Sequence, residues 1–508
     1  DAGWTVRDRK LVNASGQQMK FEILLNSPSF ERVALPYRDW LSRLGVDASV
    51  KHVSAASLFD AQGRYKLTEA VEEAHRTPDR ERSKLQRQLI SFDERFEMLY
   101  MTFRGSTLRV FPIPGDANNT WQDIAQTTAR LDAAQKQQYG AAFDALSRGV
   151  QTGDNASVMA GITGVAALQQ QYGAKVLPPT KRLNAELFYN RSHLFSWMML
   201  PLLGTFVVLM AVYIWNLFRN RNQRLSFRNP FYTAGMAMYV IAFVGMVTAY
   251  VMRWIASGRA PISNGHESLL FISIAVALAG LIFEFVYRLG APASLGGLLT
   301  TIILGVSMLS TFDPAIGPLV PVLVSYWLNI HVTIITASYG FLGLSALIGM
   351  LTLILLMTKR QGRQNVREAI GTLDNLNKHV TIAGLGLLTV GTLLGGVWAN
   401  ESWGRYWGWD PKETWALITI LVYAVVLHFR WMPAMRSVWL NASLSTAAVS
   451  SVVMTYFGVN YFLSGLHSYA AGDPMSVPAW VYIGVVIMAV LIGIAGLVDR
   501  NRRWDAAA

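Results

Sequence analysis

The chain has 508 residues, of which 52% are hydrophobic and only 15% are charged. A soluble protein of this length carries more charge, so the composition predicts an α-helical polytopic membrane protein. The net charge of +12 would favour nucleic-acid binding in a soluble chain, but here the cations can lie on cytoplasmic loops and face anionic lipid. We therefore expect membrane lipid, and no nucleic acid, as a partner. The sequence has no cysteine, which excludes disulfides and thiolate-ligated metals, so any thiol chemistry must involve thiol-reducing or thiol-bearing partner proteins.

Residues 1–190 are predicted to form a soluble α+β domain outside the cytoplasm. The periodicity of the residues indicates two short strands and two helical segments, at Lys20–Leu25, 107–112, 66–100 and 132–172. Two consecutive prolines at 178 and 179 mark the end of this domain. The chain starts at Asp1, with neither a methionine nor a signal peptide, so we expect a processed or truncated product that lacks upstream helices.

Nine apolar runs follow, each near the roughly 20 residues that cross a bilayer. They lie at 195–217, 231–252, 269–288, 293–310, 331–357, 380–397, 415–430, 438–463 and 477–498. Arginines and lysines cluster after the first, fifth, seventh and ninth runs, and the positive-inside rule assigns those loops to the cytoplasm. The soluble domain and the loops at 253–266, 313–331, 398–415 and 467–478 are then on the outer side.

The outer segment at 398–415 is unusually rich in tryptophan. It reads W-A-N-E-S-W-G-R-Y-W-G-W-D-P-K-E-T-W and holds five tryptophans, two glycines and a tyrosine. We interpret it as neither strand nor helix. Its aromatic faces suit a large flat apolar ligand, and its glycines let the backbone approach one. The alternative is an aromatic belt at the membrane surface, which also gathers tryptophan and tyrosine.

Three histidines stand out on this topology. His331 opens the fifth run and His467 follows the eighth, so both lie at the outer surface beside the Trp-rich segment. Two neutral imidazoles at one depth suit an axial iron site, although each alone could be an interfacial histidine that forms a hydrogen bond. His428 lies thirteen residues after Trp415, about 20 Å along a helix. An ionisable group at that depth is a functional candidate, and a histidine capped by a carbonyl near a helix end is the alternative.

Several spaced motifs together resemble the cytochrome c synthase of the system II pathway, specifically its Trp-rich-domain subunit. They are W-G-R-Y-W-G-W-D-P-K-E-T-W at 403–415, L-N-I-H-V at 328–332, V-V-L-H-F-R at 425–430, the turn at His467 and the stretch at 253–269. The resemblance covers about 230–500. Residues 1–217 resemble more loosely the end of the partner subunit, which implies a fused synthase with domains at 1–190, 191–229 and 230–508. It also implies the inner membrane of a bacterium, with the soluble domain and the Trp-rich loop in the periplasm.

The resemblance implies heme b as substrate and bound ligand, and apocytochrome c with a CxxCH motif as partner. His331 and His467 correspond to the two external histidines that ligate heme iron in the family, and His428 to the one that holds heme within the membrane. The counterpart of His428 belongs to a partner-subunit helix that has no match here. The 253–269 motif departs from the family pattern, because His266 stands where an aromatic residue is expected and Arg259 where a histidine is expected.

Heme binding requires aromatic walls, axial nitrogens and cations for the two propionates. The predicted aromatic contacts are Trp398, Trp403, Trp407 and Trp409. Four cations at the outer face are exceptions to the positive-inside pattern, and some of them are predicted to bind the propionates: Arg253, Arg259, Arg405 and Lys412. The bound heme would be presented to the CxxCH thiols, which add to its vinyl groups. Asp410 is a candidate proton donor or acceptor in that addition, although shaping the turn and capping the helix after Pro411 is the more natural role.

Three other functions use part of the same pattern. A heme-delivery protein of the system I type shares the Trp-rich loop and the external histidines, but the fused outward domain argues against it. A respiratory b-type cytochrome places paired histidines within facing helices, and the sequence shows one deep histidine, His428. A transporter with an aromatic gate would leave His331 and His467 unexplained.

Overall fold

The computed structural model divides the chain into two compact units, Asp1–Leu177 and Pro178–Ala508, and each is described by itself. The described residues are 5–7, 10–13, 16–25, 31–43, 46–52, 65–78, 81–103, 105–219, 224–309, 312–317, 319, 323–358, 364–463, 465, 477 and 479–504. The predicted domain limits at 190 and 229 stay predictions.

The strands of the first unit are short and form three separate two-stranded sheets. The pairs are β1 (Thr5–Arg7) with β2 (Lys10–Val12), β3 (Lys20–Leu25) with β4 (Asp47–His52), and β5 (Phe111–Pro112) with β6 (Trp121–Gln122). The predicted strand at Lys20–Leu25 is confirmed as β3, which pairs in parallel with β4. The one predicted at 107–112 shrinks to the two residues of β5.

Each helical segment predicted in the first unit is divided into two helices. The unit contains α1 (Glu31–Arg43), α2 (Thr68–Arg76), α3 (Lys84–Phe103), α4 (Ile124–Thr128), α5 (Ala133–Thr152) and α6 (Asn155–Gly173). Gly153 ends α5 with a φ of +70°, and the Asp154 carboxylate accepts from the first backbone N–H groups of α6. A left-handed glycine followed by an aspartate cap is the usual way to stop one helix and start the next.

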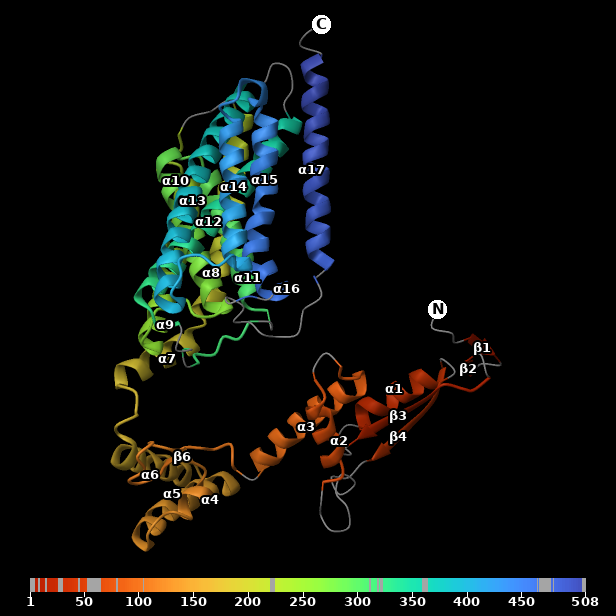
Figure 1. The fold of residues 1–508 in the computed structure, drawn as a ribbon, viewed down its shortest axis with the longest axis vertical. Helices are drawn as coiled ribbons and strands as arrows, with labels where there is room; N and C mark the ends of the chain where they lie inside the picture. Colours follow the sequence, from red (N-terminus) through yellow and green to blue (C-terminus); the bar gives the residue numbers. More distant parts are fainter. Residues whose placement is uncertain are drawn as a thin grey trace. The chain divides into compact units, whose positions relative to one another are not determined.

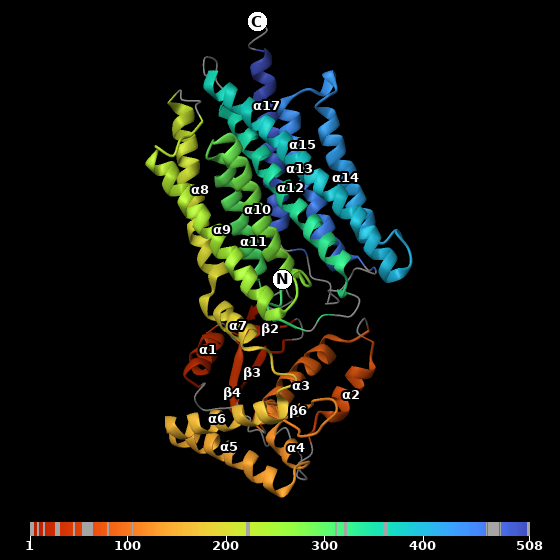
Figure 2. The ribbon, with the colours of Figure 1, turned by 90° about the vertical axis from the view of Figure 1, so that its left-hand side faces the viewer.

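The second unit is a bundle of long helices (Figures 1 and 2). Its helices are α7 (Thr180–Ser192), α8 (Leu194–Phe218), α9 (Pro230–Ser257), α10 (Gly265–Tyr287), α11 (Ala291–Ser307), α12 (Tyr326–Thr358), α13 (Gln364–Trp403), α14 (Pro411–Phe429), α15 (Val438–Val453), α16 (Val459–Phe462) and α17 (Ala479–Trp504), with a 3-10 turn at Pro433–Met435 and a π-helix at Met454–Gly458. Eight helical segments among the described residues are long and apolar enough to cross a membrane. The chain is therefore a polytopic membrane protein.

Of the nine predicted spans, the one at 293–310 is not among the eight candidate spans of the structure. It corresponds to α11, which has 17 residues and is shorter than the eight candidate spans. At 1.5 Å per residue it extends about 26 Å, close to the roughly 30 Å of a bilayer core. α11 packs against α8, α10 and α12 inside the bundle. It is therefore packed among the candidate spans, and its crossing of the membrane stays a prediction.

The helix α13 is much longer than predicted. Its 40 residues extend about 60 Å, twice the thickness of the hydrocarbon core, whereas the sequence predicted a span at 380–397. α13 packs along α12, and α12 also contacts α10 and α15. Because α13 continues past the predicted run at 380–397, its last turns reach one end of the bundle. There they contact the N-terminal ends of α12 and α14.

Candidate functional site

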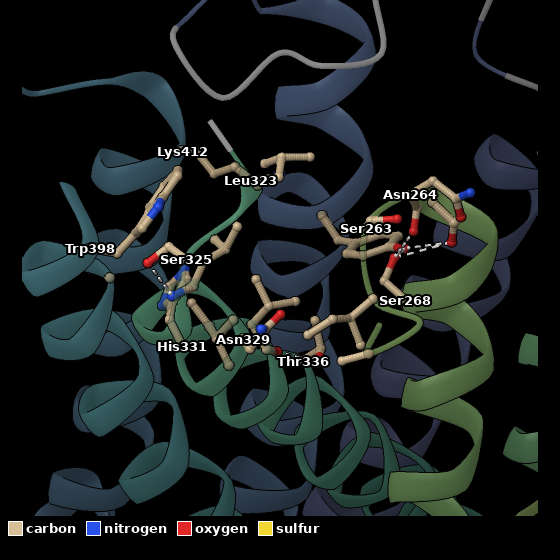
Figure 3. Close-up of a pocket in the computed structure, with 18 of the residues that line it drawn as sticks. Ser263, Asn264, Ser268, Leu323, Ser325, Asn329, His331, Thr336, Trp398 and Lys412 are labelled. Carbon is tan, nitrogen blue, oxygen red and sulfur yellow. Dashed lines mark hydrogen bonds between the residues drawn. The ribbon is translucent and has the colours of Figure 1, made fainter. Parts of the chain in front are cut away.

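A cavity of about 670 Å³ lies among the helix ends at one end of the second unit (Figure 3). Ser263, Asn264 and Ser268 form one side, and His331 and Trp398 lie across the cavity from them. The volume is typical of a small-molecule site. Its polar and aromatic lining residues include Arg259, His266, Asp313, Tyr326, Tyr339, Tyr406, Trp407, Lys412, Glu413, Tyr456, Asn460 and Tyr461.

His331 lies in the second turn of α12 with a fixed ring. Its Nδ1 is 2.7 Å from the carbonyl oxygen of Gly391 in α13. A carbonyl can only accept, so Nδ1 carries the proton and Nε2 carries the lone pair that binds metals. A Cβ on Gly395 would lie 2.6 Å from the His331 ring, so the glycine lets α13 approach this closely. The hydrogen bond to Gly391 fixes the orientation of the imidazole. Histidines that ligate metals are usually oriented in the same way, by a hydrogen bond from the ring nitrogen that does not bind the metal.

Trp398 covers the His331 ring. The two rings are stacked, with centroids 6.4 Å apart and planes 10° apart. Trp398 is buried, and Trp403 meets it edge-on at 4.8 Å. Both tryptophans belong to α13, so the prediction that 398–415 is neither strand nor helix is wrong at this end. The helix continues until Gly404, whose φ of +71° ends it in the left-handed region that glycine favours.

The connection between α13 and α14 is a loop of seven residues, 404–410. Trp407 lines the cavity, and its ring meets that of Trp409 edge-on at 5.9 Å. Trp409 is 72% exposed and is not part of the described cavity wall. Its φ of +56° is strained for a bulky side chain, at a cost of about 1–3 kcal/mol. The geometry thus brings Trp398 and Trp407 to the cavity and leaves Trp409 exposed, outside the described cavity wall.

Asp410 caps α14, as the turn-and-cap alternative predicted. Its carboxylate accepts from the backbone N–H of Lys412, and the Glu413 carboxylate accepts from the backbone N–H groups of Asp410 and Gly408. This reciprocal arrangement is a capping box, which stabilises a helix beginning by roughly 0.5–2 kcal/mol. The Asp410 carboxylate therefore accepts hydrogen bonds as the helix cap, and Asp410 is not among the residues of the described cavity wall.

Lys412 is a cation in the cavity wall. Its Nζ donates to Oδ1 of Asn460 at 2.7 Å, and Asn460 follows the π-helix Met454–Gly458. In the same π-helix, the Tyr456 hydroxyl lies 2.6 Å from the Ser268 hydroxyl of α10. Single turns of π-helix occur frequently at functional sites because they shift side chains relative to a regular helix. Here the π-helix turn places both polar groups, Tyr456 and Asn460, at the cavity.

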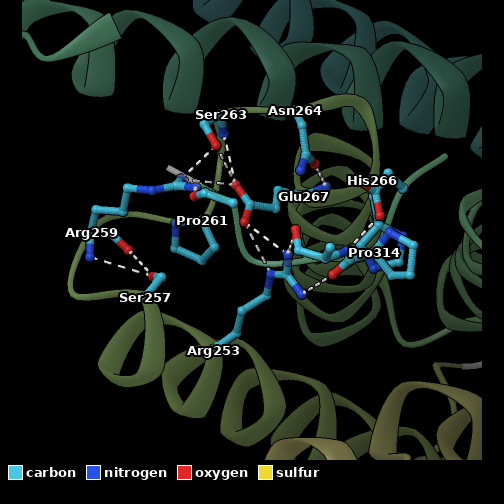
Figure 4. Close-up of polar contacts among 12 residues, drawn as sticks. Arg253, Ser257, Arg259, Pro261, Ser263, Asn264, His266, Glu267 and Pro314 are labelled. Atoms are coloured by element: carbon cyan, nitrogen blue, oxygen red, sulfur yellow. Dashed lines mark hydrogen bonds and ion pairs between the residues drawn. The ribbon is translucent and has the colours of Figure 1, made fainter. Parts of the chain in front are cut away.

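Arg253 lies in a buried ion-pair cluster (Figure 4). Its Nε and Nη2 donate to Oε1 of Glu267 at 3.1 and 2.9 Å, and its Nη1 donates to the carbonyl of Pro314 at 3.0 Å. Both charged side chains are fully buried. Arg253, predicted to bind a propionate, is outside the described cavity wall. The structure therefore gives it a different partner, the Glu267 carboxylate.

Arg259 shares Glu267 with Arg253 but reaches the cavity. Its Nη1 lies 3.3 Å from Oε2 of Glu267, and its Nη2 donates to the carbonyl of Gly317. Ser263 gives Oε2 two further hydrogen bonds, from its N–H and its hydroxyl. Arg259 lines the cavity with its side chain 20% exposed. Of the predicted propionate partners, Arg259 and Lys412 thus lie at the cavity.

Arg405 is held within its own loop. Its guanidinium occupies the space that a Cβ on Gly408 would take. Arg405 is half-buried and is not among the residues that line the described cavity wall.

His428 lies at the far end of α14, sixteen residues and about 24 Å from Lys412. Its Nδ1 donates to the carbonyl of Ala424 at 2.7 Å, and its ring meets Trp431 edge-on. This is the carbonyl-capped arrangement that the sequence left open. Any role of His428 on a ligand's route through the membrane stays a prediction. His467 lies outside the described residues, although Gly465, two residues before it, lies against the Asp410 carboxylate.

Three residues were missed by the sequence reasoning: Tyr456 and Asn460 in the cavity wall, and Glu267, which binds Arg259 beside it. Glu267 was detectable, because an acidic residue at the start of an apolar run needs a cationic partner, and Arg253 lies fourteen residues earlier. Tyr456 and Asn460 gave no such signal, because a π-helix is not visible in the apolar pattern of α15 and α16. Among the described residues, no group of three or more histidines and carboxylates forms a metal site.

Known proteins with similar sequences agree on one family. The family model described as "Cytochrome C assembly protein" matches residues 262–467, which include the cavity wall from α10 to α14. A cytochrome c biogenesis protein CcsA from Guillardia theta is 35% identical over 268 residues, and the match covers 87% of that protein and 48% of this chain. The chain belongs to the cytochrome c assembly family. Members of this family act in cytochrome c biogenesis, so heme handling is the context in which the cavity has to be understood.

Other relatives extend the match beyond the family region. Protein NrfI from Wolinella succinogenes is 38% identical over 427 residues, covering 82% of this chain but 46% of NrfI. CcsA from Chlamydomonas reinhardtii is 38% identical over 231 residues, covering 44% of this chain and 65% of that protein. The chain thus spans between about half and two thirds of these two relatives. A solved structure titled "Cytochrome c Heme Lyase CcmF" is similar over 60% of this chain and 51% of that chain at 15% identity, with a TM-score of 0.40, too low to establish a common fold.

Proposed function

We propose that this protein is a cytochrome c synthase that brings heme to the outer face of the membrane and attaches it to the CxxCH thiols of apocytochrome c. The observation that carries this proposal is His331, whose Nδ1–H donates to Gly391 and whose ring lies under Trp398 in the wall of a 670 Å³ cavity. An imidazole with this tautomer presents Nε2 as an iron ligand.

The other cavity residues fit a porphyrin. Trp398 and Trp407 supply flat apolar surface, and Arg259 and Lys412 supply two cations for two propionates. Trp403 supports Trp398 from outside the wall. In this proposal three predicted residues do not touch the heme. Arg253 belongs to the ion-pair cluster with Glu267, and the loop 404–410 contains Arg405 and Trp409. Heme b is the form we propose, because a chain without cysteine forms no thioether to it.

The reaction is addition of a thiol across a vinyl double bond. The cysteine sulfur bonds to the vinyl carbon next to the ring, and a proton is added to the terminal carbon, so no atom is lost and no net oxidation takes place. The protein's contribution is to hold the heme edge and exclude water while the thiols approach. Asp410, fixed by its capping box, orients the beginning of α14 and with it Lys412.

His467 is proposed as the second axial ligand, as the family resemblance implies. It is supported by the position of Gly465, two residues earlier in the chain, against Asp410 at the beginning of α14. His428, at the other end of α14, is proposed to hold heme on its way to the cavity. The cavity end of the bundle and the first unit are then periplasmic, and the membrane is the bacterial inner membrane.

The proposal is tested by co-expressing the chain with an apocytochrome c in a bacterium deleted for its own cytochrome c maturation system. We expect a heme-stained cytochrome band on a denaturing gel, and none with His331→Gly or with an apocytochrome whose CxxCH cysteines are serines. If the protein binds heme but the apocytochrome stays heme-free, it delivers or retains heme without ligation, as a system I protein or a b-type cytochrome would. A protein that contains no heme contradicts the whole proposal.

A further inference from the structure

The two cations that line the cavity, Arg259 and Lys412, differ in their partners. Arg259 is paired with the Glu267 carboxylate at 3.3 Å. The half-buried Lys412 donates one hydrogen bond from Nζ, to Oδ1 of Asn460 at 2.7 Å, and within the described part of the chain no carboxylate lies at ion-pair distance from it. Withdrawing a charge from water costs free energy unless an opposite charge compensates it. An unpaired ammonium in a cavity wall therefore indicates a negatively charged ligand.

The acidic residues beside Lys412 in the chain are engaged in the helix cap. The Asp410 carboxylate accepts from the backbone N–H of Lys412, and the Glu413 carboxylate accepts from the backbone N–H groups of Gly408 and Asp410. The Lys412 ammonium binds a neutral amide instead. Because an ammonium has three N–H donors and Asn460 accepts from one of them, two remain for a ligand.

The side chain of Asn460 is fixed in the orientation that Lys412 requires. Its Nδ2 donates to the carbonyl of Tyr456 at 2.7 Å, so Oδ1 is the amide atom that accepts from the ammonium. The π-helix that precedes Asn460 also contacts α14, since the Thr455 hydroxyl lies 3.1 Å from the carbonyl oxygen of Trp415. Asn460 is therefore held in place relative to the first turns of α14, which carry Lys412.

We propose that Asn460 is a positioning residue that holds the Lys412 ammonium at the cavity, where it binds one carboxylate of the ligand. This inference rests on the proposed function, under which that carboxylate is a heme propionate. The two propionates of heme lie on one half of the ring and the two vinyl groups on the other. A propionate bound at Lys412 therefore decides which way round the ring lies in the cavity, and with it where the vinyl groups meet the thiols.

The test measures the affinity of the purified full-length protein for ferric heme and for its dimethyl ester, in which both propionates are uncharged. We expect wild type to bind heme about tenfold more tightly than the ester, because hydrogen bonds between charged groups are the stronger ones. Lys412→Met removes the charge and Asn460→Leu removes its position, so each should lower that ratio several-fold. Lys378→Met, in α13 and outside the described cavity wall, should keep the wild-type ratio.

A substitution that only disturbs the fold weakens the binding of both ligands alike. An unchanged ratio in Asn460→Leu therefore overturns the role of Asn460 and leaves the proposed function intact, and so does a wild type that binds heme and ester equally. Wild-type protein that binds neither overturns both. If the leucine variant is lost from the membrane, Asn460→Asp replaces it, because its carboxylate pairs with the ammonium in place of the propionate. The same fall in the ratio is then expected, and an unchanged ratio again overturns the inference.

Discussion

At the scale of single residues, the site depends on small distances around His331. Its Nδ1 is 2.7 Å from the Gly391 carbonyl, and Gly395, one turn later in α13, has no room for a side chain beside the ring. The glycines of α13 could be read from the sequence only as features of an apolar helix. Their function depends on a contact with α12, 60 residues away in the chain, which no local pattern reveals.

Replacing Gly395 by alanine should displace the His331 ring. The added methyl would lie 2.6 Å from the imidazole, so the ring has to rotate and the bond to Gly391 is strained or lost. We expect purified Gly395→Ala protein to retain several-fold less heme than wild type. Gly386→Ala is the matched control, because a Cβ there meets no atom within 4 Å in the same helix. Equal heme retention in the two variants would contradict the close approach.

At the scale of elements, the Trp-rich segment consists of a helix end, a loop and a helix beginning. The sequence correctly indicated the cap at Asp410 and the helix start at Pro411, because an Asp-Pro pair followed by glutamate is a strong local signal. It failed at Trp398 and Trp403, which remain helical in α13. The rings of Trp398 and His331 stabilise that last part of the helix by packing, and tertiary contacts of this kind override weak local propensity.

Within this segment, Trp407→Ala and Trp403→Ala should differ from Trp409→Ala. Trp407 lines the cavity and Trp403 supports Trp398, and an aromatic contact contributes about 0.5–1.5 kcal/mol beyond its buried area. We expect the first two variants to bind heme up to about tenfold more weakly, whereas the exposed Trp409 should be replaceable with little effect on heme affinity. Titration of heme into the purified variants measures this. Full affinity in all three would favour an interfacial belt.

The buried ion pair between Arg253 and Glu267 connects α9 to α10. Glu267→Gln would leave Arg253 charged and fully buried without its counter-charge, which typically costs about 3–5 kcal/mol. We expect a clearly lower thermal unfolding temperature in detergent, read from the membrane unit. Glu72→Gln, which breaks the exposed pair with Arg76, should leave that temperature unchanged. Similar small effects of both changes would show that Arg253 finds another partner.

At the scale of the whole molecule, the apolar pattern predicted the spans well because the bilayer sets their length. The positions of the charged residues predicted the sides of the loops but not the ion pairs between helices. Arg253 and Arg259 are exceptions to the positive-inside rule, and the structure pairs both of them with the single carboxylate of Glu267, in the first turn of α10. Pairings of this kind depend on how helices pack, so they could not be predicted from loop charges.

The number of crossings can be tested with single cysteines, because the chain has none of its own. Three helices, α9, α10 and the short α11, separate Ser226 from Ala315. If all three cross, the two positions lie on opposite sides of the membrane. We expect a membrane-impermeant maleimide to label Ala315→Cys in intact cells and Ser226→Cys only after permeabilisation. Labelling of both from the same side would show that α11 does not span.

The ligation state of the heme tests the central claim most directly. The account predicts that heme bound to the purified protein is extracted by acid acetone and has a six-coordinate, low-spin spectrum with His331 as one ligand. His331→Gly should turn this spectrum into a five-coordinate one, and added imidazole should restore the low-spin form by entering the space of the missing ring. If His331→Gly binds heme with an unchanged low-spin spectrum in the absence of imidazole, His331 is not a ligand and the cavity is not the heme site.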